Sequence, residues 1–200
     1  MQKIPKIAVV GRPNVGKSKL FNAILKKRKA IVDEQEGVTR DRMYAKSECF
    51  GIPFTLIDTG GIDERSKAPF NDLVKEQAKM AIAEADSLIM VVDGKIGATD
   101  LDIELADLLL RTKKPLCLAV NKVDDPSQVY MLNEFYKLGI KEMIPVSAVQ
   151  NWQIAELLES ALKHNEPEEN ASIDEEIEPL LEIAIVGKPN VGKSSLINKI

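Results

Sequence analysis

The sequence is poor in cysteine, histidine and aromatic residues. Two cysteines in 200 residues are too few for a disulfide framework or a cysteine metal cluster. Cys49 and Cys117 both fall within apolar runs, so we expect them to be buried free thiols in strands. The single histidine, His164, lies near the end of the last helical pattern, where a partial positive charge suits the helix dipole. We expect it to have no catalytic role.

Long apolar runs and an excess of basic residues are absent as well. No run approaches the roughly 18 apolar residues of a membrane-spanning helix, and residues 1–6 contain no apolar signal-peptide core. We therefore expect a cytoplasmic protein with no membrane partner. Residues 1–165 carry 24 basic and 23 acidic side chains, so their charge gives no sign of binding to DNA or RNA.

Apolar runs alternate with helical patterns along the chain, which indicates an α/β fold with a mainly parallel sheet and helices on both faces. The link between the second and third runs, residues 51–53, is too short for a parallel crossover, so one strand of the six should be antiparallel. The predicted strands are 4–10, 44–50, 54–58, 87–93, 116–121 and 143–146. The predicted helices lie near 17–28, 70–85, 100–112, 127–138 and 152–164.

A phosphate-binding motif, G-x-x-x-x-G-K-[ST], follows the first predicted strand and opens the first predicted helix. Its glycines let the backbone curl so that N–H groups face phosphate oxygens, and the helix N-terminus adds a partial positive charge. We expect Lys17 to meet the β- and γ-phosphates and Ser18 to ligate Mg²⁺. The candidate phosphate-binding residues are Gly11, Arg12, Pro13, Asn14, Val15, Gly16, Lys17 and Ser18.

An Asn-Lys-Val-Asp sequence follows the predicted strand 116–121, at the edge where open α/β sheets bind ligands. The carboxylate of Asp124 only accepts hydrogen bonds, so it can take the N1 and N2 donors of guanine, whereas adenine presents no such pair. Asn121 can bond the base or brace the loop, and the stem of Lys122 can lie over the purine. The candidate guanine-binding residues are Asn121, Lys122, Val123, Asp124, Ser147 and Ala148, the last two through backbone N–H groups.

A third group of candidates surrounds the expected γ-phosphate. Asp58 ends a predicted strand and fits an outer partner of Mg²⁺, while Gly60 or Gly61 offers a backbone N–H to the γ-phosphate. Thr39 lies in the loop after the first helix, and we expect its hydroxyl to reach Mg²⁺ before hydrolysis and to be released afterwards. The candidate switch and catalytic residues are Thr39, Asp58, Thr59, Gly60, Gly61 and Ile62.

The phosphate motif occurs a second time, 176 positions after the first. Between residues 7–24 and 183–200, 13 of 18 paired positions are identical, which indicates a duplicated domain. The chain holds no second Asn-Lys-x-Asp, so we expect the second loop not to bind GTP here. Its residues are Gly187, Lys188, Pro189, Asn190, Val191, Gly192, Lys193 and Ser194. We predict a first G domain at 1–165, an acidic linker at 166–180 and the truncated start of a second domain at 181–200.

These motifs resemble the translation-factor-related GTPases, and the duplicated loop narrows the resemblance to the EngA/Der family, bacterial tandem-G-domain GTPases of ribosome assembly. The resemblance rests on both phosphate loops and on three further segments, Gly37-Val-Thr-Arg-Asp41, Asp58-Thr-Gly-Gly61 and Asn121-Lys-Val-Asp124. It implies a P-loop G domain that hydrolyses GTP to GDP and phosphate and takes part in large-subunit assembly. Family members continue through a complete second G domain and a KH-like domain, so we expect this chain to be a fragment.

The resemblance also bears on the mechanism. Ile62 stands where many regulatory GTPases carry a water-orienting glutamine, and in the resembled family turnover is supported by a monovalent cation. Asn14 matches a position whose side-chain oxygen ligates K⁺ in related potassium-activated GTPases, although it can instead merely shape the loop. After Ser147 and Ala148 the family usually has a glycine-containing turn, whereas this chain has Asn151, which tolerates left-handed geometry. Trp152 is interpreted as a packing residue.

The expected ligands are therefore GTP or GDP, Mg²⁺ and K⁺, with the large ribosomal subunit or its assembly intermediates as the partner that the resemblance implies. We favour a GTP-hydrolysing switch. A regulatory guanine-nucleotide-binding module with little intrinsic turnover is the alternative, which Ile62 favours. An ATP-dependent kinase or ATPase shares only the phosphate loop, and the Asn121-Lys-Val-Asp124 segment opposes it.

Overall fold

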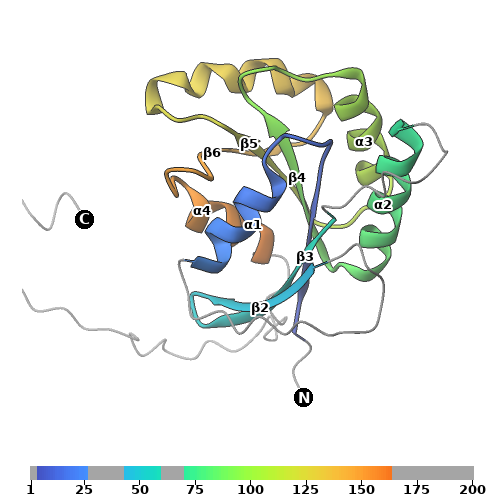
Figure 1. The fold of residues 1–200 in the computed structure, drawn as a ribbon, viewed down its shortest axis with the longest axis vertical. Coiled ribbons are helices and arrows are strands. Elements are labelled where there is room, and N and C mark those ends of the chain that lie inside the picture. The colour runs from blue at the N-terminus through green and yellow to red at the C-terminus, as the bar shows by residue number, and fades with distance from the viewer. Residues whose placement is uncertain (1–3, 27–42, 60–69, 164–200) are drawn as a thin grey trace, which may run out of the picture. The chain divides into compact units, whose positions relative to one another are not determined.

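The computed structural model describes residues 4–26, 43–59 and 70–163, which form a six-stranded sheet with helices on both faces (Figure 1). The chain divides into two units, 1–167 and 168–200, and all described residues belong to the first. Several predicted site residues lie outside the described ranges: Thr39, Gly60, Gly61, Ile62 and the second phosphate loop, Gly187 to Ser194. Within the described ranges, no helix is long and apolar enough to cross a membrane.

The sheet has the strand order β2-β3-β1-β4-β5-β6. β2 runs antiparallel to β3, and every other neighbouring pair is parallel, which confirms the predicted single antiparallel strand. The strands are β1 (Lys6–Val10), β2 (Met43–Cys49), β3 (Ile52–Asp58), β4 (Ser87–Asp93), β5 (Leu116–Asn121) and β6 (Glu142–Val146).

The turn between β2 and β3 is tighter than the sequence predicted. Phe50 and Gly51 have φ of 51° and 79°, so both adopt the left-handed conformation of a two-residue hairpin turn. β3 therefore begins at Ile52 and includes Pro53, which we had assigned to the link. Pro53 is tolerated there because the part of β3 that pairs with β1 begins only at Thr55.

The helices cover the two faces of the sheet in pairs (Figure 1). α1 and α4 pack on one face and α2 and α3 on the other, and each face has its own buried apolar cluster. β1 contributes side chains to both clusters, because Ile7 and Val9 point to one face of the sheet and Ala8 and Val10 point to the other. The helices are α1 (Lys17–Lys26), α2 (Phe70–Glu84), α3 (Asp100–Leu110), η1 (Pro126–Leu138) and α4 (Ile154–Leu162).

The helix predicted near 127–138 is present, but it is a 3₁₀ helix. Its apolar residues Leu132, Phe135 and Leu138 are spaced by three, which places them on one face at three residues per turn. The Asp125 side chain caps the start by accepting a hydrogen bond from the Ser127 N–H at 2.8 Å. The three-residue spacing of these apolar side chains therefore favours a 3₁₀ helix over an α-helix here.

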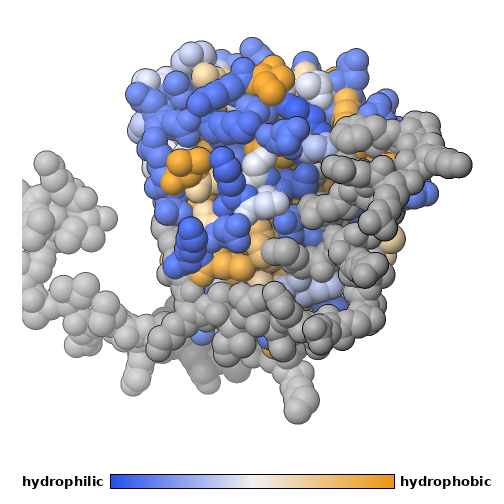
Figure 2. All heavy atoms as spheres, in the orientation of Figure 1, coloured by the Kyte–Doolittle hydropathy of each residue, from blue (hydrophilic) through white to orange (hydrophobic). Residues whose placement is uncertain are grey.

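The exposed surface of the domain is mainly polar on the face that Figure 2 shows, with apolar residues in separate spots among the coloured atoms. Both cysteines are buried free thiols, as predicted: Cys49 is 0% and Cys117 2% exposed. All seven residues of β4 are buried, as is typical of a central parallel strand covered on both faces.

The register of the sheet brings the carboxyl ends of the five mutually parallel strands, β1, β3, β4, β5 and β6, to one edge. Val9 of β1 pairs with Asp58 of β3, and Asp93 of β4 pairs with Asn121 of β5. Asn121 in turn pairs with Val146 at the end of β6. The segments that follow these strands therefore meet at the edge where open α/β sheets bind ligands.

Candidate functional site

The phosphate loop connects β1 to α1, and its backbone requires two of the motif glycines. Gly16 has φ of 99°, and a Cβ there would clash with the side-chain amide of Asn121. A Cβ at Gly11 would clash with the carbonyl oxygen of Val91. Asn14 also adopts the left-handed conformation, with φ of 64°. The loop is thus curled tightly against the ends of β4 and β5.

Lys17 folds back over this loop, where its Nζ donates a hydrogen bond to the carbonyl oxygen of Arg12 at 2.9 Å. Burial lowers the pKa of Lys17, and the nearby positive charge of Arg12 lowers it further, whereas the Asp58 carboxylate raises it. The three side chains therefore share one electrostatic environment at the edge of the sheet.

Asp58 and Thr59 lie at the end of β3, beside the phosphate loop. Asp58 is only 2% exposed. The Thr59 hydroxyl donates to the carbonyl oxygen of Val9 at 2.9 Å and so ties the end of β3 to β1. Ser18 is exposed near the start of α1. Within the described ranges there is no group of three or more His, Cys, Asp or Glu side chains that could hold a metal ion.

Asn121 joins the phosphate loop to the loop after β6. Its Nδ2 donates to the carbonyl oxygen of Val15 at 2.8 Å, and its Oδ1 accepts from the backbone N–H of Ala148 at 3.1 Å. The side chain is buried, so both hydrogen bonds are shielded from water. The sequence left two roles open for Asn121, and the geometry shows that it braces the loops.

The carboxylate of Asp124 is held by two donors at the rim of the site. Its Oδ1 accepts from the Ser147 hydroxyl at 2.8 Å, and its Oδ2 accepts from Lys95 Nζ at 2.7 Å. The hydrogen bond from Lys95, followed by that from Ser147, lowers the pKa of Asp124. The side chain is 34% exposed, so an ionised acceptor faces solvent at this position.

The loop after β6 folds without the glycine-containing turn of the resembled family. Ser147 and Trp152 exchange two backbone hydrogen bonds, of 3.2 and 3.1 Å, which close the loop. Asn151 has φ of 56°, which confirms the predicted left-handed geometry, and Gln153 follows with φ of 54°. Trp152 packs against the buried cluster under α2 and α3, as its interpretation as a packing residue required.

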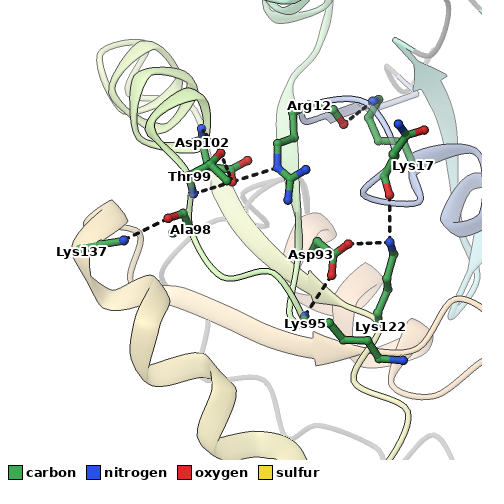
Figure 3. Close-up of polar contacts among 10 residues, drawn as sticks. Arg12, Lys17, Asp93, Lys95, Ala98, Thr99, Asp102, Lys122 and Lys137 are labelled. Carbon is green, nitrogen blue, oxygen red and sulfur yellow. Dashed lines mark hydrogen bonds and ion pairs between the residues drawn. The ribbon is translucent and has the colours of Figure 1, made fainter.

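Lys122 makes contacts that link it to a residue the sequence analysis missed. Its Nζ donates to the carbonyl oxygen of Asn14 at 3.0 Å and to Asp93 Oδ2 at 2.5 Å (Figure 3). Asp93 ends the fully buried strand β4 and pairs in register with Asn121. A carboxylate directly after the apolar run Leu88 to Val92, at the ligand-binding edge, was the signal that could have revealed it.

The phosphate loop after β1, Asp58 at the end of β3 and the Asn-Lys-Val-Asp segment that begins at the end of β5 define a P-loop GTPase domain. A family described as 50S ribosome-binding GTPase matches residues 6–122 and 182–200. The chain belongs to this family, and curated relatives of up to 58% identity are GTPases Der, which confirms the resemblance to EngA/Der proteins.

Among these relatives, GTPase Der of Protochlamydia amoebophila is 58% identical over 99% of this chain and 40% of its own length. GTPase Der of Persephonella marina is 44% identical over 98% of this chain and 45% of its own length. The chain thus spans less than half the length of these two relatives.

Solved structures share the fold. Era of Aquifex aeolicus, bound to GDP and AlF₄⁻, has a TM-score of 0.63 at 28% identity, covering 80% of this chain and 56% of that one. The cytosolic domain of FeoB from T. maritima in a GDP form has a TM-score of 0.60 at 25% identity, covering 84% of this chain and 66% of that one. These likenesses confirm the predicted P-loop G-domain fold.

Proposed function

We propose that this chain binds GTP and hydrolyses it to GDP and phosphate. The observation that carries the proposal is the bridge made by Asn121 between Val15 of the phosphate loop and Ala148 of the loop after β6. This bridge fixes the Asn-Lys-Val-Asp segment beside the phosphate loop. A single nucleotide can therefore meet both its phosphate-binding and its base-binding groups.

Each candidate residue has a task in this arrangement. Lys17 supplies positive charge to the β- and γ-phosphates, and the backbone N–H groups of the phosphate loop, in which only Pro13 has none, face their oxygens. Asp124 accepts the N1 and N2 donors of guanine, for which its exposed, ionised carboxylate is suited. The stem of Lys122 lies over the purine while its Nζ stays on Asn14. Val123 is buried and its N–H donates to Val146, which supports the loop from beneath.

The residues at the end of β3 and the start of α1 fit Mg²⁺. An exposed serine hydroxyl and a buried aspartate are hard oxygen donors, which this ion prefers. Mg²⁺ in nucleotide sites is held through one or two protein oxygens plus phosphates, so no larger carboxylate cluster is needed. Ser18 would bind the ion directly and Asp58 through its outer shell. The ion neutralises charge on the phosphate oxygens when it is bound.

We also propose a K⁺ site at Asn14. Its side chain is exposed and its backbone is left-handed, and its own carbonyl oxygen accepts a hydrogen bond from Lys122 Nζ. We propose that four further residues complete the γ-phosphate region: Thr39, Gly60, Gly61 and Ile62. This proposal rests only on their positions in the sequence. The domain limits 1–165, 166–180 and 181–200 are proposals of the same kind.

A role in assembly of the large ribosomal subunit is the finer part of the proposal. It is supported by the family description, 50S ribosome-binding GTPase, and by the relatives' name, GTPase Der. Era, a structural neighbour of 28% identity, has been solved in complex with nucleotides 1506–1542 of 16S ribosomal RNA, which supports a link between proteins that contain this fold and the ribosome. The proposal therefore also places this chain in the cytoplasm.

The alternative, a guanine-nucleotide-binding module with little turnover, is favoured by one feature. Ile62 follows the Asp-Thr-Gly-Gly segment and has no side-chain hydrogen-bonding group with which to orient a water molecule. Binding and turnover must therefore be measured separately.

Equilibrium binding to the full chain tests the binding step. We expect GTP and GDP to compete with a fluorescent GDP, and ATP not to compete. Lys17→Ala should weaken GTP binding far more than guanosine binding, whereas Lys19→Ala, an exposed residue on the same helix, should change neither. Competition by ATP equal to that by GTP would contradict the guanine site. Equal losses for GTP and guanosine in Lys17→Ala would contradict the role of Lys17.

A further inference from the structure

Two buried carboxylates, Asp93 and Asp102, flank the connection between β4 and α3. We call residues 93–102 the β4–α3 segment. Asp93 is 1% and Asp102 0% exposed, although neither belongs to the phosphate or guanine motifs. A buried carboxylate is costly unless it is paired, so each must have a partner that holds it. In this chain both partners are basic side chains of the nucleotide site.

At the first end, Asp93 holds Lys122. Oδ2 of Asp93 accepts from Lys122 Nζ at 2.5 Å, and Oδ1 accepts from the backbone N–H of Lys95 at 3.0 Å. The same Lys122 Nζ donates to the carbonyl oxygen of Asn14 at 3.0 Å. The ammonium group therefore connects the carboxylate to the phosphate loop, and its position depends on both.

At the second end, Asp102 holds Arg12. Oδ2 of Asp102 accepts from Arg12 Nε at 3.2 Å, and also from the backbone N–H and hydroxyl of Thr99 at 3.0 and 2.8 Å. Thr99 is the N-cap of α3, so the carboxylate is fixed by a capping box at the helix start. The Arg12 side chain is only 14% exposed. The contact between Arg12 and Asp102 thus joins the phosphate loop to the first turn of α3.

The β4–α3 segment also contacts η1 through Lys137 (Figure 3). Lys137 Nζ donates to the carbonyl oxygen of Ala98 at 3.0 Å. Gly97 has φ of 82°, and a Cβ there would clash with the side chain of Glu134. The segment therefore contacts η1 as well as the phosphate loop.

We propose that the β4–α3 segment holds the phosphate loop at two points, Arg12 and Asn14, and that Asp93 and Asp102 are positioning residues for nucleotide binding. This inference rests on the proposed function. Neither carboxylate touches the nucleotide: Asp102 acts through Arg12, and Asp93 acts through Lys122 on Asn14. A loop held in its binding geometry before the nucleotide arrives loses less conformational freedom on binding, so the nucleotide is retained longer.

The test is the rate at which the full chain releases a fluorescent GDP (mant-GDP) after excess unlabelled GDP is added. Asp93→Asn and Asp102→Asn keep the side-chain shape and remove the charge. Because charge-assisted hydrogen bonds are the strong ones, we expect each variant to release the probe about tenfold faster or more. The matched control is Asp107→Asn, which removes the same charge from the exposed side of α3 and should release at the wild-type rate.

Double variants separate positioning from a general loss of stability. Asp93→Asn with Lys122→Met, and Asp102→Asn with Arg12→Met, should each release no faster than the faster of their single variants, since each carboxylate acts through its partner. A purely structural role would lower the melting temperature and leave the release rate of folded molecules unchanged. Additive accelerations in the double variants would overturn the inference.

Arg12→Lys provides a second route if Asp102→Asn does not fold. The second copy of the motif carries Lys188 at this position, so lysine is compatible with the loop, but it lacks the Nε that reaches Asp102. We expect faster release in this variant as well. If Asp93→Asn, or both Asp102→Asn and Arg12→Lys, bind mant-GDP and release it at the wild-type rate, the inference of two holding points is wrong, while the proposed function still stands. No binding of mant-GDP by the wild-type chain would overturn the proposed function, and the inference with it.

Discussion

The Nδ2 atom of Asn121 lies 2.8 Å from the carbonyl oxygen of Val15, so a buried hydrogen bond joins the guanine motif to the phosphate loop. The same side chain accepts from the Ala148 N–H at 3.1 Å. Asn121 therefore acts on the base and phosphate regions at once, and its loss should affect both.

We predict that Asn121→Ala both destabilises the domain and weakens guanine-nucleotide binding. The substitution leaves a carbonyl and an N–H buried without their partner, which costs about 1–3 kcal/mol for each group. Thermal unfolding and titration with GDP measure the two effects. Asn133→Ala is the control, because Asn133 is exposed on η1. An unchanged GDP affinity in Asn121→Ala would contradict the bracing role.

Asp124→Asn should shift preference from guanine towards xanthine nucleotides. An amide presents N–H donors where xanthine has a carbonyl in place of the amino group of guanine. Competition between GTP and xanthosine triphosphate measures the shift. The neighbouring Asp125→Asn is a matched control, since Asp125 caps η1 and asparagine caps helices equally well. Retention of the wild-type GTP preference by Asp124→Asn would show that the base site is assigned wrongly.

Removal of the Asn14 side chain should abolish most K⁺ stimulation of GTP hydrolysis while GDP still binds. The backbone there is left-handed, so Asn14→Gly removes the side-chain oxygen without the strain that alanine would add. Turnover in K⁺ and in Na⁺ provides the measurement, with GDP titration as the folding control. Undiminished K⁺ stimulation would indicate that Asn14 only shapes the loop.

Neither cysteine should react with thiol reagents in the native protein. Burial raises the pKa of Cys117 to about 12, so its reactive thiolate is scarce at pH 8. Cys49 is also buried. Labelling with a chromogenic disulfide reagent should give no rapid reaction in buffer and two equivalents in guanidinium. A rapidly labelled thiol in the native chain would contradict the described packing.

The sequence predicted the fold best for segments whose local residue pattern matches their final position in the sheet. The apolar run Leu88 to Val92, between Ser87 and Asp93, predicted the bounds of β4 correctly, because the interior of a strand buried on both faces has no polar interruption. The phosphate loop and Asn121 were predicted from motifs whose spacing reflects the geometry of a nucleotide. The antiparallel pair was predicted, but its turn was placed at residues 51–53 and lies at Phe50 and Gly51, because a non-glycine residue with positive φ leaves little trace in sequence.

The contacts of Asp93 and Asp102 could not be predicted from residue spacing. Asp102 reads as an ordinary first-turn helix acid, and only the packing of α3 brings it to Arg12, 90 positions earlier. Asp93 likewise gains its role from the register of β4 and β5, which places Lys122 beside it. Pairings of this kind depend on three-dimensional contacts between segments whose separate patterns are ordinary.

Phosphate release from GTP by the full chain tests the central claim most directly. We predict turnover with GTP and Mg²⁺ that is faster in K⁺ than in Na⁺, none with ATP, and none in Lys17→Ala, with Lys19→Ala unchanged. Tight GTP binding without phosphate release in either salt would contradict the claim and favour the binding module. Release from ATP at the rate for GTP would contradict the guanine site itself.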